Sequence, residues 1–327
     1  MTVVETIPNN PPRARPKMLA VCIRNLRVKY GKFEAVKGIS IDIPEGEVFG
    51  FIGPNGAGKS STFRVLATLQ PHYQGQALVC GLDVLSQPQK VRDVMGFVPD
   101  FFGVYEDLTA LEYLNFFAAA YKLPISTRKG TIDDVLSLTD MTHKADSPVD
   151  GLSRGMKQRL ALARVLLHDP KVLLLDEPSS GLDPRARIEM RELLKALREM
   201  GKTIVISSHI LSELSQLCTR IGIIELGQMV VQGSLDEIYQ RLQLMRVIHV
   251  RAENASPELL DRVGRIPGVD SVEQQVDRWA IKLHEEQLSV ADLHQAVVEC
   301  GARLTMFQPE AMDMETAFMK LTEGKTA

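Results

Sequence analysis

Apolar residues in the first part of the chain come in short runs. Between residues 19 and 43 these runs alternate apolar and polar positions, and they are interrupted at Gly31, at Gly38 and at Pro44-Glu45-Gly46. Short alternating runs with turn residues at this density predict an antiparallel sheet of short strands. The segment Val48 to Ile52 that follows is apolar and predicts a buried strand.

Further along, apolar runs alternate with a helical pattern. Val172 to Leu175 and Thr203 to Ile206 are almost continuously apolar, as expected for parallel strands buried on both faces. Between them, Asp183-Pro184 begins a segment whose apolar residues recur at i, i+3, i+4 and i+7, which predicts a helix. Strand, helix and strand in this order predict an α/β domain with a parallel sheet and with ligands at the carboxyl ends of its strands.

The region from residue 101 to the strand at 172–175 is predicted to be helical. Residues 101–121 hold seven of the eighteen Phe, Tyr and Trp residues, and Thr109 with Glu112 forms a capping box that opens a helix to about Tyr121. Segments 131–138 and 154–167 predict two further helices. Because the first helix is apolar on more than one face, it is either buried in the local core or covered by a partner.

The pattern changes again after residue 242. Residues 234–242 predict a helix that closes a first domain, and the remainder follows the order β-α-β-β-α-β, which is the ferredoxin-like split. Its segments are 247–251, 257–263, 269–276, 279–284, 290–300 and 303–307. We therefore predict a disordered, proline-rich tail at 1–17, a main α/β domain at 18–242 and an α+β accessory domain at 243–327. The accessory domain has no catalytic or metal-binding motif, which predicts a regulatory or structural role.

Composition narrows the class of protein. The chain has 327 residues, a net charge of −3 and a pI near 6.2, so no overall positive charge favours nucleic acid or anionic lipid. No apolar stretch approaches the ~18 residues that span a bilayer, and the N-terminus lacks a signal pattern, which predicts a cytoplasmic protein. The four cysteines form no C-x-x-C pair, which predicts reduced thiols.

Nine residues after the first buried strand carry the clearest chemical signal. The segment is Gly53-Pro54-Asn55-Gly56-Ala57-Gly58-Lys59-Ser60-Ser61, and it fits G-x-x-x-x-G-K-[ST]. Its glycines let successive N–H groups turn toward phosphate oxygens, and a predicted helix over residues 60–69 directs its positive end at the same anion. Lys59 is expected to reach the β- and γ-phosphates, and the Ser60 hydroxyl is expected to bind Mg²⁺.

Three other candidate residues follow the buried strands. Asp176 and Glu177 come directly after the run 172–175. Asp176 is expected to hold Mg²⁺, directly or from a more distant position, and Glu177 to orient or deprotonate the attacking water. His209 follows the run 203–206, where it is either a donor to the γ-phosphate or a helix-capping or packing residue.

Two sets of residues allow more than one interpretation from their positions alone. Tyr30 precedes the phosphate loop and either stacks on adenine or belongs to the core. Ser153 and Gly155 lie at the start of the helix over 154–167, where they present hydrogen-bond donors to an anion. Taken alone, Ser153 and Gly155 indicate only a helix with a well-capped N-terminus.

Together these segments resemble the motifs of the ATP-binding-cassette (ABC) ATPases. In the family's terms they are a Walker A loop at 53–60, a signature at 152–158 in place of LSGGQ, a Walker B strand at 172–177, a D-loop at 181–183, a switch histidine at His209 and an adenine-stacking aromatic at Tyr30. The resemblance covers residues 18–242. It implies a P-loop NTPase cassette with a RecA-like parallel core sheet, an antiparallel β subdomain and a helical subdomain.

The resemblance also implies the cofactors ATP and Mg²⁺, with Lys59, Glu177 and His209 as the catalytic residues. Two departures from the family pattern concern the site. The signature has Arg154 and Met156, although Ser153 and Gly155 of the usual motif are present. The Q-loop ends in Asp100, where the family has glutamine. A carboxylate at position 100 is a possible Mg²⁺ ligand, but it adds negative charge near phosphate.

The Phe101 to Tyr105 stretch, the signature and the added C-terminal domain resemble the ABC-2 type exporter ATPases of the drug and polysaccharide branches. That resemblance implies a homodimer in which Ser153 of one copy closes on ATP held by Lys59 of the other. It also implies a separate membrane permease that docks near residues 101–121 and holds the chain on the inner face of the membrane. The alternatives are a soluble ABC ATPase that acts on ribosomes or DNA, and a regulator that binds ATP and hydrolyses it weakly.

Overall fold

The computed structural model describes residues 18–101, 103, 107–209, 214, 216–234, 237–238, 246–284 and 287–310. Two compact units account for them, the first built from 18–209 and 216–232 and the second mainly from 233–310. The predicted tail at 1–17 and most of the predicted helix at 234–242 lie outside the described residues. In the described part of the chain, no helix combines the length and the apolar character needed to cross a membrane.

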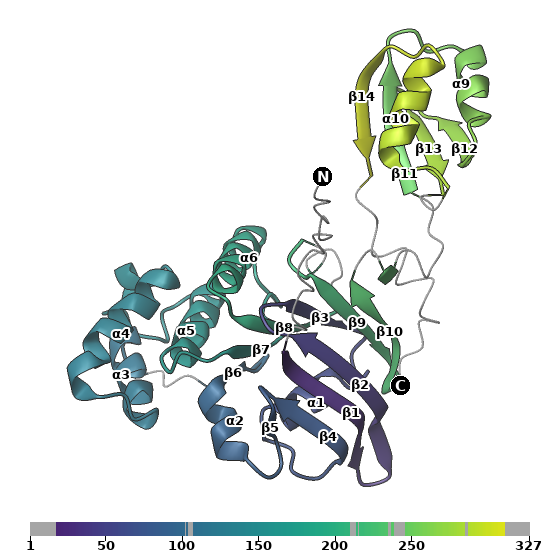
Figure 1. The fold of residues 1–327 in the computed structure, drawn as a ribbon. Coiled ribbons are helices and arrows are strands. Elements are labelled where there is room, and N and C mark those ends of the chain that lie inside the picture. Colours follow the sequence, from purple (N-terminus) through teal and green to yellow (C-terminus); the bar gives the residue numbers. More distant parts are fainter. Residues whose placement is uncertain are drawn as a thin grey trace, which may run out of the picture. The chain divides into compact units, whose positions relative to one another are not determined.

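A six-stranded sheet forms the centre of the first unit (Figure 1). Its strands, in spatial order, are β10 (Gln228–Ser234), β9 (Arg220–Glu225), β3 (Val48–Ile52), β8 (Thr203–Ser208), β7 (Val172–Asp176) and β6 (Met95–Val98). The five strands from β9 to β6 are parallel, and β3, β7 and β8 are buried along their whole length. Because Ile52 pairs with Ser208 and Asp176 pairs with Ser207, the carboxyl ends of these three strands meet at one edge.

The predicted antiparallel sheet is confirmed, with longer strands than expected. Its strands, in spatial order, are β2 (Phe33–Pro44), β1 (Leu19–Tyr30), β4 (Gln74–Val79) and β5 (Leu82–Asp83). Irregularities of register within β1, including one between Ile23 and Leu26, explain why the pattern suggested several short strands. Tyr30 pairs with Phe33 across a two-residue turn, which places their side chains on the same face.

Helices lie beside the central sheet, and the last of them follows the predicted periodicity. They are α1 (Lys59–Leu66), α2 (Pro88–Val94) and α6 (Pro184–Glu199). Helix α6 buries the apolar positions Met190, Leu193, Leu194 and Leu197, and Asp183 caps its N-terminus by accepting from the N–H of Ala186. Helix α1 ends at Leu66, three residues before the predicted end.

Three helices pack together as a helical subdomain: α3 (Ala110–Ala120), α4 (Ile125–Leu138) and α5 (Arg154–Leu166), with a short 3₁₀ turn at Thr142–Lys144 (Figure 1). The predicted capping box of α3 is confirmed. Helix α4 begins six residues before the predicted start. Its first turn follows Pro124 and shows no apolar periodicity, because Ile125 is exposed and the three residues after it are polar. Tyr113 and Leu114 of α3 are buried, so one face of α3 belongs to the local core, whereas Phe116 is half exposed.

The second unit has the predicted ferredoxin-like order. Its elements are β11 (Arg246–Ala252), α9 (Pro257–Gly264), β12 (Val269–Gln274), β13 (Trp279–Leu283), α10 (Val290–Glu299) and β14 (Leu304–Pro309). The sheet order is β12-β13-β11-β14, and all its pairs are antiparallel. A separate hydrophobic core forms where Ile248, Trp279 and Ile281 of the sheet meet Leu259 and Leu293 of the helices.

Candidate functional site

The nine-residue loop joins the end of β3 to the start of α1. Gly58 immediately precedes α1 and has a φ of 107°, a backbone conformation that side chains rarely adopt. A Cβ atom on Gly58 would also lie 2.6 Å from the carbonyl oxygen of Ala35. Only glycine satisfies both conditions, so Gly58 fixes the turn through which the chain enters α1. The helix N-terminus, which attracts anions, lies directly after that turn.

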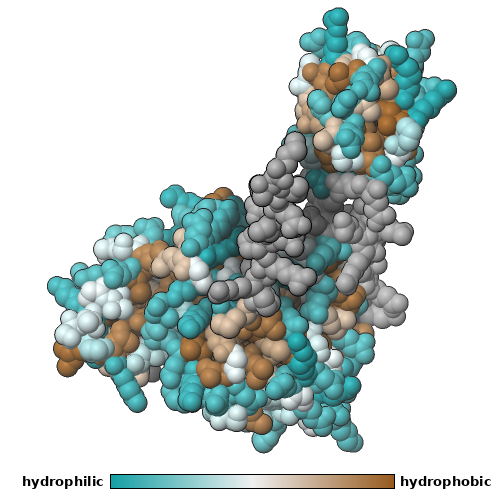
Figure 2. All heavy atoms as spheres, viewed as in Figure 1, coloured by the Kyte–Doolittle hydropathy of each residue, from teal (hydrophilic) through white to brown (hydrophobic). Residues whose placement is uncertain are grey.

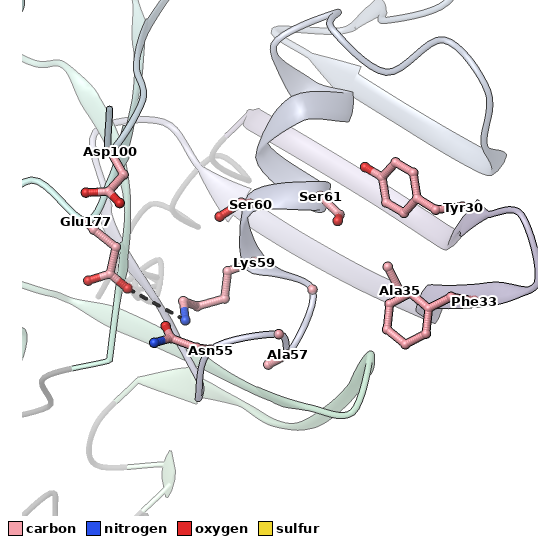
Figure 3. Close-up of a pocket in the computed structure, with 12 residues that line it drawn as sticks. Tyr30, Phe33, Ala35, Asn55, Ala57, Lys59, Ser60, Ser61, Asp100 and Glu177 are labelled. Atoms are coloured by element: carbon pink, nitrogen blue, oxygen red, sulfur yellow. Dashed lines mark ion pairs between the residues drawn. The ribbon is translucent and has the colours of Figure 1, made fainter. Parts of the chain in front are cut away.

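A pocket of about 250 Å³ lies over this loop (Figure 3). The residues that line it are Tyr30, Phe33, Ala35, Asn55, Gly56, Ala57, Gly58, Lys59, Ser60, Ser61, Asp100 and Glu177. The pocket therefore gathers residues from four parts of the chain: the β1–β2 hairpin, the loop with α1, the segment after β6 and the residue after β7. A ligand with a polyanionic end and an aromatic end would match this lining.

Lys59 is buried at the base of the pocket, with 6% of its surface exposed. Its ammonium group donates hydrogen bonds to the carbonyl oxygens of Gly53, at 2.6 Å, and Pro54, at 3.2 Å. It also lies 3.7 Å from Oε1 of Glu177. Burial lowers the pKa of Lys59, and the carboxylates of Glu177 and Asp176 partly oppose that shift. The desolvated positive charge gains more from an anion than a solvated lysine would.

Glu177 lies opposite Lys59 and is held in a fixed position. Its backbone N–H donates to Ser207 Oγ at 2.9 Å, and its φ is 51°. Its Oε2 lies 2.9 Å from Nδ1 of His209, whereas Oε1 is buried and has no hydrogen-bond partner in the described part of the chain. The ion pair with Lys59 offsets part of the cost of burying this oxygen, and a ligand or water can supply the hydrogen bond that it still lacks.

Asp176 lies outside the pocket lining. It is buried and accepts a short hydrogen bond from the Ser207 hydroxyl, so the same serine contacts both Asp176 and the backbone of Glu177. No cluster of three or more acidic, histidine or cysteine ligands occurs among the described residues. Mg²⁺ beside a nucleotide needs only one or two carboxylates, because phosphates and water supply its other ligands. Ser60, Asp100 and Asp176 fit that arrangement and do not form an all-protein cage.

The pocket contains one aromatic residue that the sequence analysis missed. Phe33 is 53% exposed and Tyr30 is 41% exposed, and the two rings lie one above the other in Figure 3. Their cross-strand pairing puts both on the face of the hairpin that also carries Ala35. The available signal was the spacing Tyr-x-x-Phe across a glycine-containing turn. Two neighbouring exposed rings offer a stacking surface for a planar base.

The predicted signature residues line a different pocket. A cavity of about 260 Å³ is lined by Asp140, His143, Ser153, Gly155, Met156, Arg159, Asp183, Arg185, Ala186 and Glu189. Ser153 caps α5 by accepting from the N–H of Met156, and Asp183 caps α6. Two helix N-termini therefore open onto this second pocket. Within one chain, the structure does not bring Ser153 or Gly155 into the lining of the loop pocket.

The site has the parts that hydrolysis of a phosphoanhydride requires. The loop and Lys59 can hold a polyphosphate, and Ser60 with a nearby carboxylate can hold its metal ion. Glu177 has a buried oxygen available to a water molecule, and His209 contacts the other oxygen of the same carboxylate. This arrangement can bind and hydrolyse a nucleoside triphosphate.

Comparison with known proteins agrees with this chemistry. The sequence matches the family described as "ABC transporter" over residues 36–180. It is 33% identical over 307 residues to the linearmycin resistance ATP-binding protein LnrL of Bacillus subtilis, a match that covers 92% of this chain and 97% of that protein. It is 30% identical over 300 residues to a Nod factor export ATP-binding protein I of Cupriavidus metallidurans, covering 92% and 96% of the two chains.

Solved structures resemble the first unit. A structure described as the ATP binding subunit of an ABC transporter has a TM-score of 0.62 and 27% identity, and it covers 68% of this chain and 93% of its own. The cbiO1 protein from Clostridium perfringens, part of the ABC transporter complex cbiONQ, has a TM-score of 0.62 and 28% identity, with coverage of 76% and 96%. The two relatives named above extend the similarity along most of the chain, including the second unit.

Proposed function

This chain belongs to the ABC transporter family as an ATPase subunit, and on that premise we propose that it drives an ABC-2 type exporter as a homodimer bound to a separate permease. The chain binds ATP, and its hydrolysis of ATP is coupled to transport. The observation that carries the proposal is the buried Oε1 of Glu177, which lies 3.7 Å from the ammonium group of Lys59 and accepts no hydrogen bond from the described residues.

In the proposed site, the loop from Gly53 to Ser61 and the N-terminus of α1 bind the phosphates. Lys59 neutralises the terminal phosphates, and its low hydration makes that interaction strong. Glu177 orients the attacking water through Oε1 and accepts its proton. His209 contacts Oε2 of Glu177 at 2.9 Å, and we assign it a hydrogen bond to the terminal phosphate when ATP is bound.

Adenine stacks against the rings of Tyr30 and Phe33, which places the base at the hairpin end of the pocket (Figure 3). Ser60, Asp100 and Asp176 would hold Mg²⁺, which would neutralise part of the phosphate charge. The Asp100 carboxylate adds a negative charge to this end of the pocket, where the family has an amide.

Ser153 does not line the loop pocket of its own chain, and this supports a dimer in which a second copy supplies it. The Ser153 hydroxyl and the N-terminus of α5 face a pocket of their own, and they complete the ATP site only if a second copy presents them. The positively polarised N-terminus of α5 suits the terminal phosphate of ATP bound to that second copy. Each dimer then contains two sites, and each site is built from both copies.

The names of the relatives support export, because one is named for linearmycin resistance and the other for Nod factor export. Apolar side chains reach the surface over the helical subdomain (Figure 2), and Phe101 and Phe116 are 89% and 50% exposed. Exposed aromatics of this kind suit a protein partner. We assign this surface to the permease, which holds the chain at the inner face of the membrane.

Complementation between two inactive variants tests the shared site. Lys59→Met disables phosphate binding, and Ser153→Arg blocks the signature surface. A mixed dimer of the two contains one intact site, formed by Lys59 of the Ser153→Arg copy and Ser153 of the Lys59→Met copy. If the copies pair at random, half of the dimers are mixed, and each mixed dimer has one intact site of its two. Single-turnover ATP hydrolysis should therefore recover to about a quarter of the wild-type amplitude.

Each variant alone should stay near background in the same assay. If the mixture is no more active than its parts, ATP is hydrolysed within one copy and the dimeric site is wrong. Co-purification of the full chain with a membrane protein, and its loss in a variant carrying Phe101→Glu and Phe116→Glu, tests the permease surface.

A further inference from the structure

Arg154, which replaces a glycine of the usual signature, lies against the loop that follows Glu177. A Cβ atom built on Gly181 would be 2.6 Å from both Cζ and Nη1 of Arg154 and 3.0 Å from its Nε. The guanidinium group therefore covers the Gly181 backbone directly. Gly181 also has a φ of 67°, so glycine is required there both by its conformation and by the arginine above it.

Local backbone hydrogen bonds connect the loop under Arg154 to Glu177. The N–H of Ser180 donates to the Glu177 carbonyl at 3.0 Å, and the N–H of Leu182 donates to the Ser179 carbonyl at 3.3 Å. At the far end, Asp183 caps α6. These bonds make residues 177–183 a compact turn, so a displacement at Gly181 is transmitted to Glu177 only four residues away.

The first turns of α5 and α6 are packed closely as well. A Cβ atom on Gly155 would lie 3.1 Å from Cβ of Ala186, which leaves little room between the two helices. One turn further on, the Arg159 side chain forms ion pairs with Glu189 of α6 and, at 3.1 Å, with Asp140 at the end of α4. Arg154 extends this helix contact to the loop that carries the candidate base.

We propose that Arg154 is a positioning residue: it holds the loop from Glu177 to Asp183 against the start of α5 and so couples the signature segment to the Glu177 carboxylate. This inference rests on the proposed function, because it assigns Arg154 an effect on hydrolysis through Glu177. A planar guanidinium can lie flat on a peptide unit and keep its charge in solvent, which a lysine ammonium cannot do equally well. When Ser153 engages a phosphate, α5 and the loop move together.

The alternative is that Arg154 only adds surface packing. Arg154 and Gly181 are both exposed, and exposed contacts contribute little to folding stability. A packing role therefore predicts an unchanged turnover number. A role in direct phosphate binding predicts a raised KM instead. A positioning role predicts a lower kcat with ATP affinity retained, because the water is misplaced in the transition state and the phosphates are still held.

The test compares full-length Arg154→Ala with wild type. We expect kcat for ATP to fall by roughly tenfold, with KM and the thermal unfolding midpoint nearly unchanged. Arg154→Lys should recover only part of the loss. Arg92→Ala is a matched control, because Arg92 is also an exposed arginine on a helix of the first unit and lies outside both pockets. That control should retain wild-type kcat.

A second variant separates the loop contact from a charge effect. Gly181→Ala keeps Arg154 but puts a methyl group where its guanidinium lies and strains the backbone at a φ of 67°, so it should lower kcat by at least as large a factor. The double variant should be much less impaired than the product of the two single effects, because both remove one contact. If the effects of the two single variants multiply in the double variant, the inference is overturned. It is also overturned if kcat of Arg154→Ala lies within twofold of wild type, or if Arg154→Ala raises KM and retains kcat.

Glu177→Gln distinguishes failure of the inference from failure of the proposed function. If Glu177→Gln abolishes hydrolysis while Arg154→Ala leaves kcat intact, only the positioning role is wrong. If Glu177→Gln itself keeps wild-type turnover, the proposed site is wrong and the role of Arg154 falls with it.

Discussion

Replacement of Glu177 by glutamine is the most direct perturbation of the candidate site. Glutamine has nearly the same shape, so the side chain can keep its position between Lys59 and His209. The change removes the negative charge and the ability to accept a proton from water. The backbone contacts to Ser207 do not involve the altered group, so the loop should stay in place.

Two contributions set the size of the effect. Loss of a positioned general base costs about 10² to 10⁴ in rate, which is roughly 3 to 5 kcal/mol in the barrier. In addition, opposite charges about 4 Å apart attract by about 4 kcal/mol at an effective dielectric of 20, before the cost of desolvation. Glu177 Oε1 and the Lys59 ammonium, at 3.7 Å, lose that attraction in the variant. In the variant, a bound phosphate anion therefore stabilises the Lys59 charge by more than it does in the wild type.

We therefore expect kcat to fall by at least about a hundredfold while ATP affinity is retained or rises. The assay measures phosphate release under single and multiple turnover, and equilibrium dialysis measures ATP binding. Glu192→Gln is the control, because Glu192 is an exposed glutamate on α6 that pairs with Lys195 outside the pocket. It should behave as wild type in both measurements.

Two results would refute the reasoning. A kcat within threefold of wild type would show that Glu177 does not act on the attacking water. A loss of ATP affinity as large as the loss of kcat would show that the carboxylate only supports the phosphate site through Lys59. The second result would leave the phosphate loop in place and remove the role assigned to Oε1.

Three further predictions concern other parts of the pocket. Asp100→Gln should keep ATP binding and change turnover or its coupling to transport, since it restores an amide beside the phosphates; unchanged hydrolysis and transport would contradict a role for Asp100. Phe33→Ala should raise KM for ATP about two- to tenfold with kcat retained, since one stacking contact is lost, whereas Phe116→Ala should leave KM unchanged. Because burial lowers the pKa of Lys59, the unfolded chain binds more protons between that lowered pKa and 10.5, so the free energy of unfolding should rise with pH across this window. Lys59→Met should lack that rise in urea unfolding without nucleotide, and an identical pH dependence in both proteins would contradict the burial effect.

Local sequence patterns were enough to determine most of the fold. The apolar runs at Val172 and Thr203 become fully buried parallel strands, and the i, i+3, i+4, i+7 pattern after Asp183 becomes the buried face of α6. Periodicity works here because burial on one or two faces dictates which positions are apolar. It failed at the start of α4, where the one apolar residue of the first turn, Ile125, is exposed and only Pro124 marks the beginning.

The phosphate loop and the acidic residues Asp176 and Glu177 at the end of β7 were identifiable because their predicted function depends on residue type and spacing along the chain. What each side chain contacts was not identifiable in this way. The contacts that Ser207 makes with Asp176 and with the backbone of Glu177 depend on how β7 and β8 lie side by side.

The sequence by itself thus determined the order of the elements, the phosphate loop and the family. Only the tertiary structure decided that Phe33 joins Tyr30, that Ser153 faces a separate pocket and that Arg154 covers Gly181. The physical reason is that periodicity and motifs are properties of neighbouring residues. The other contacts depend on the distances between residues far apart in the chain, which packing of the whole unit sets.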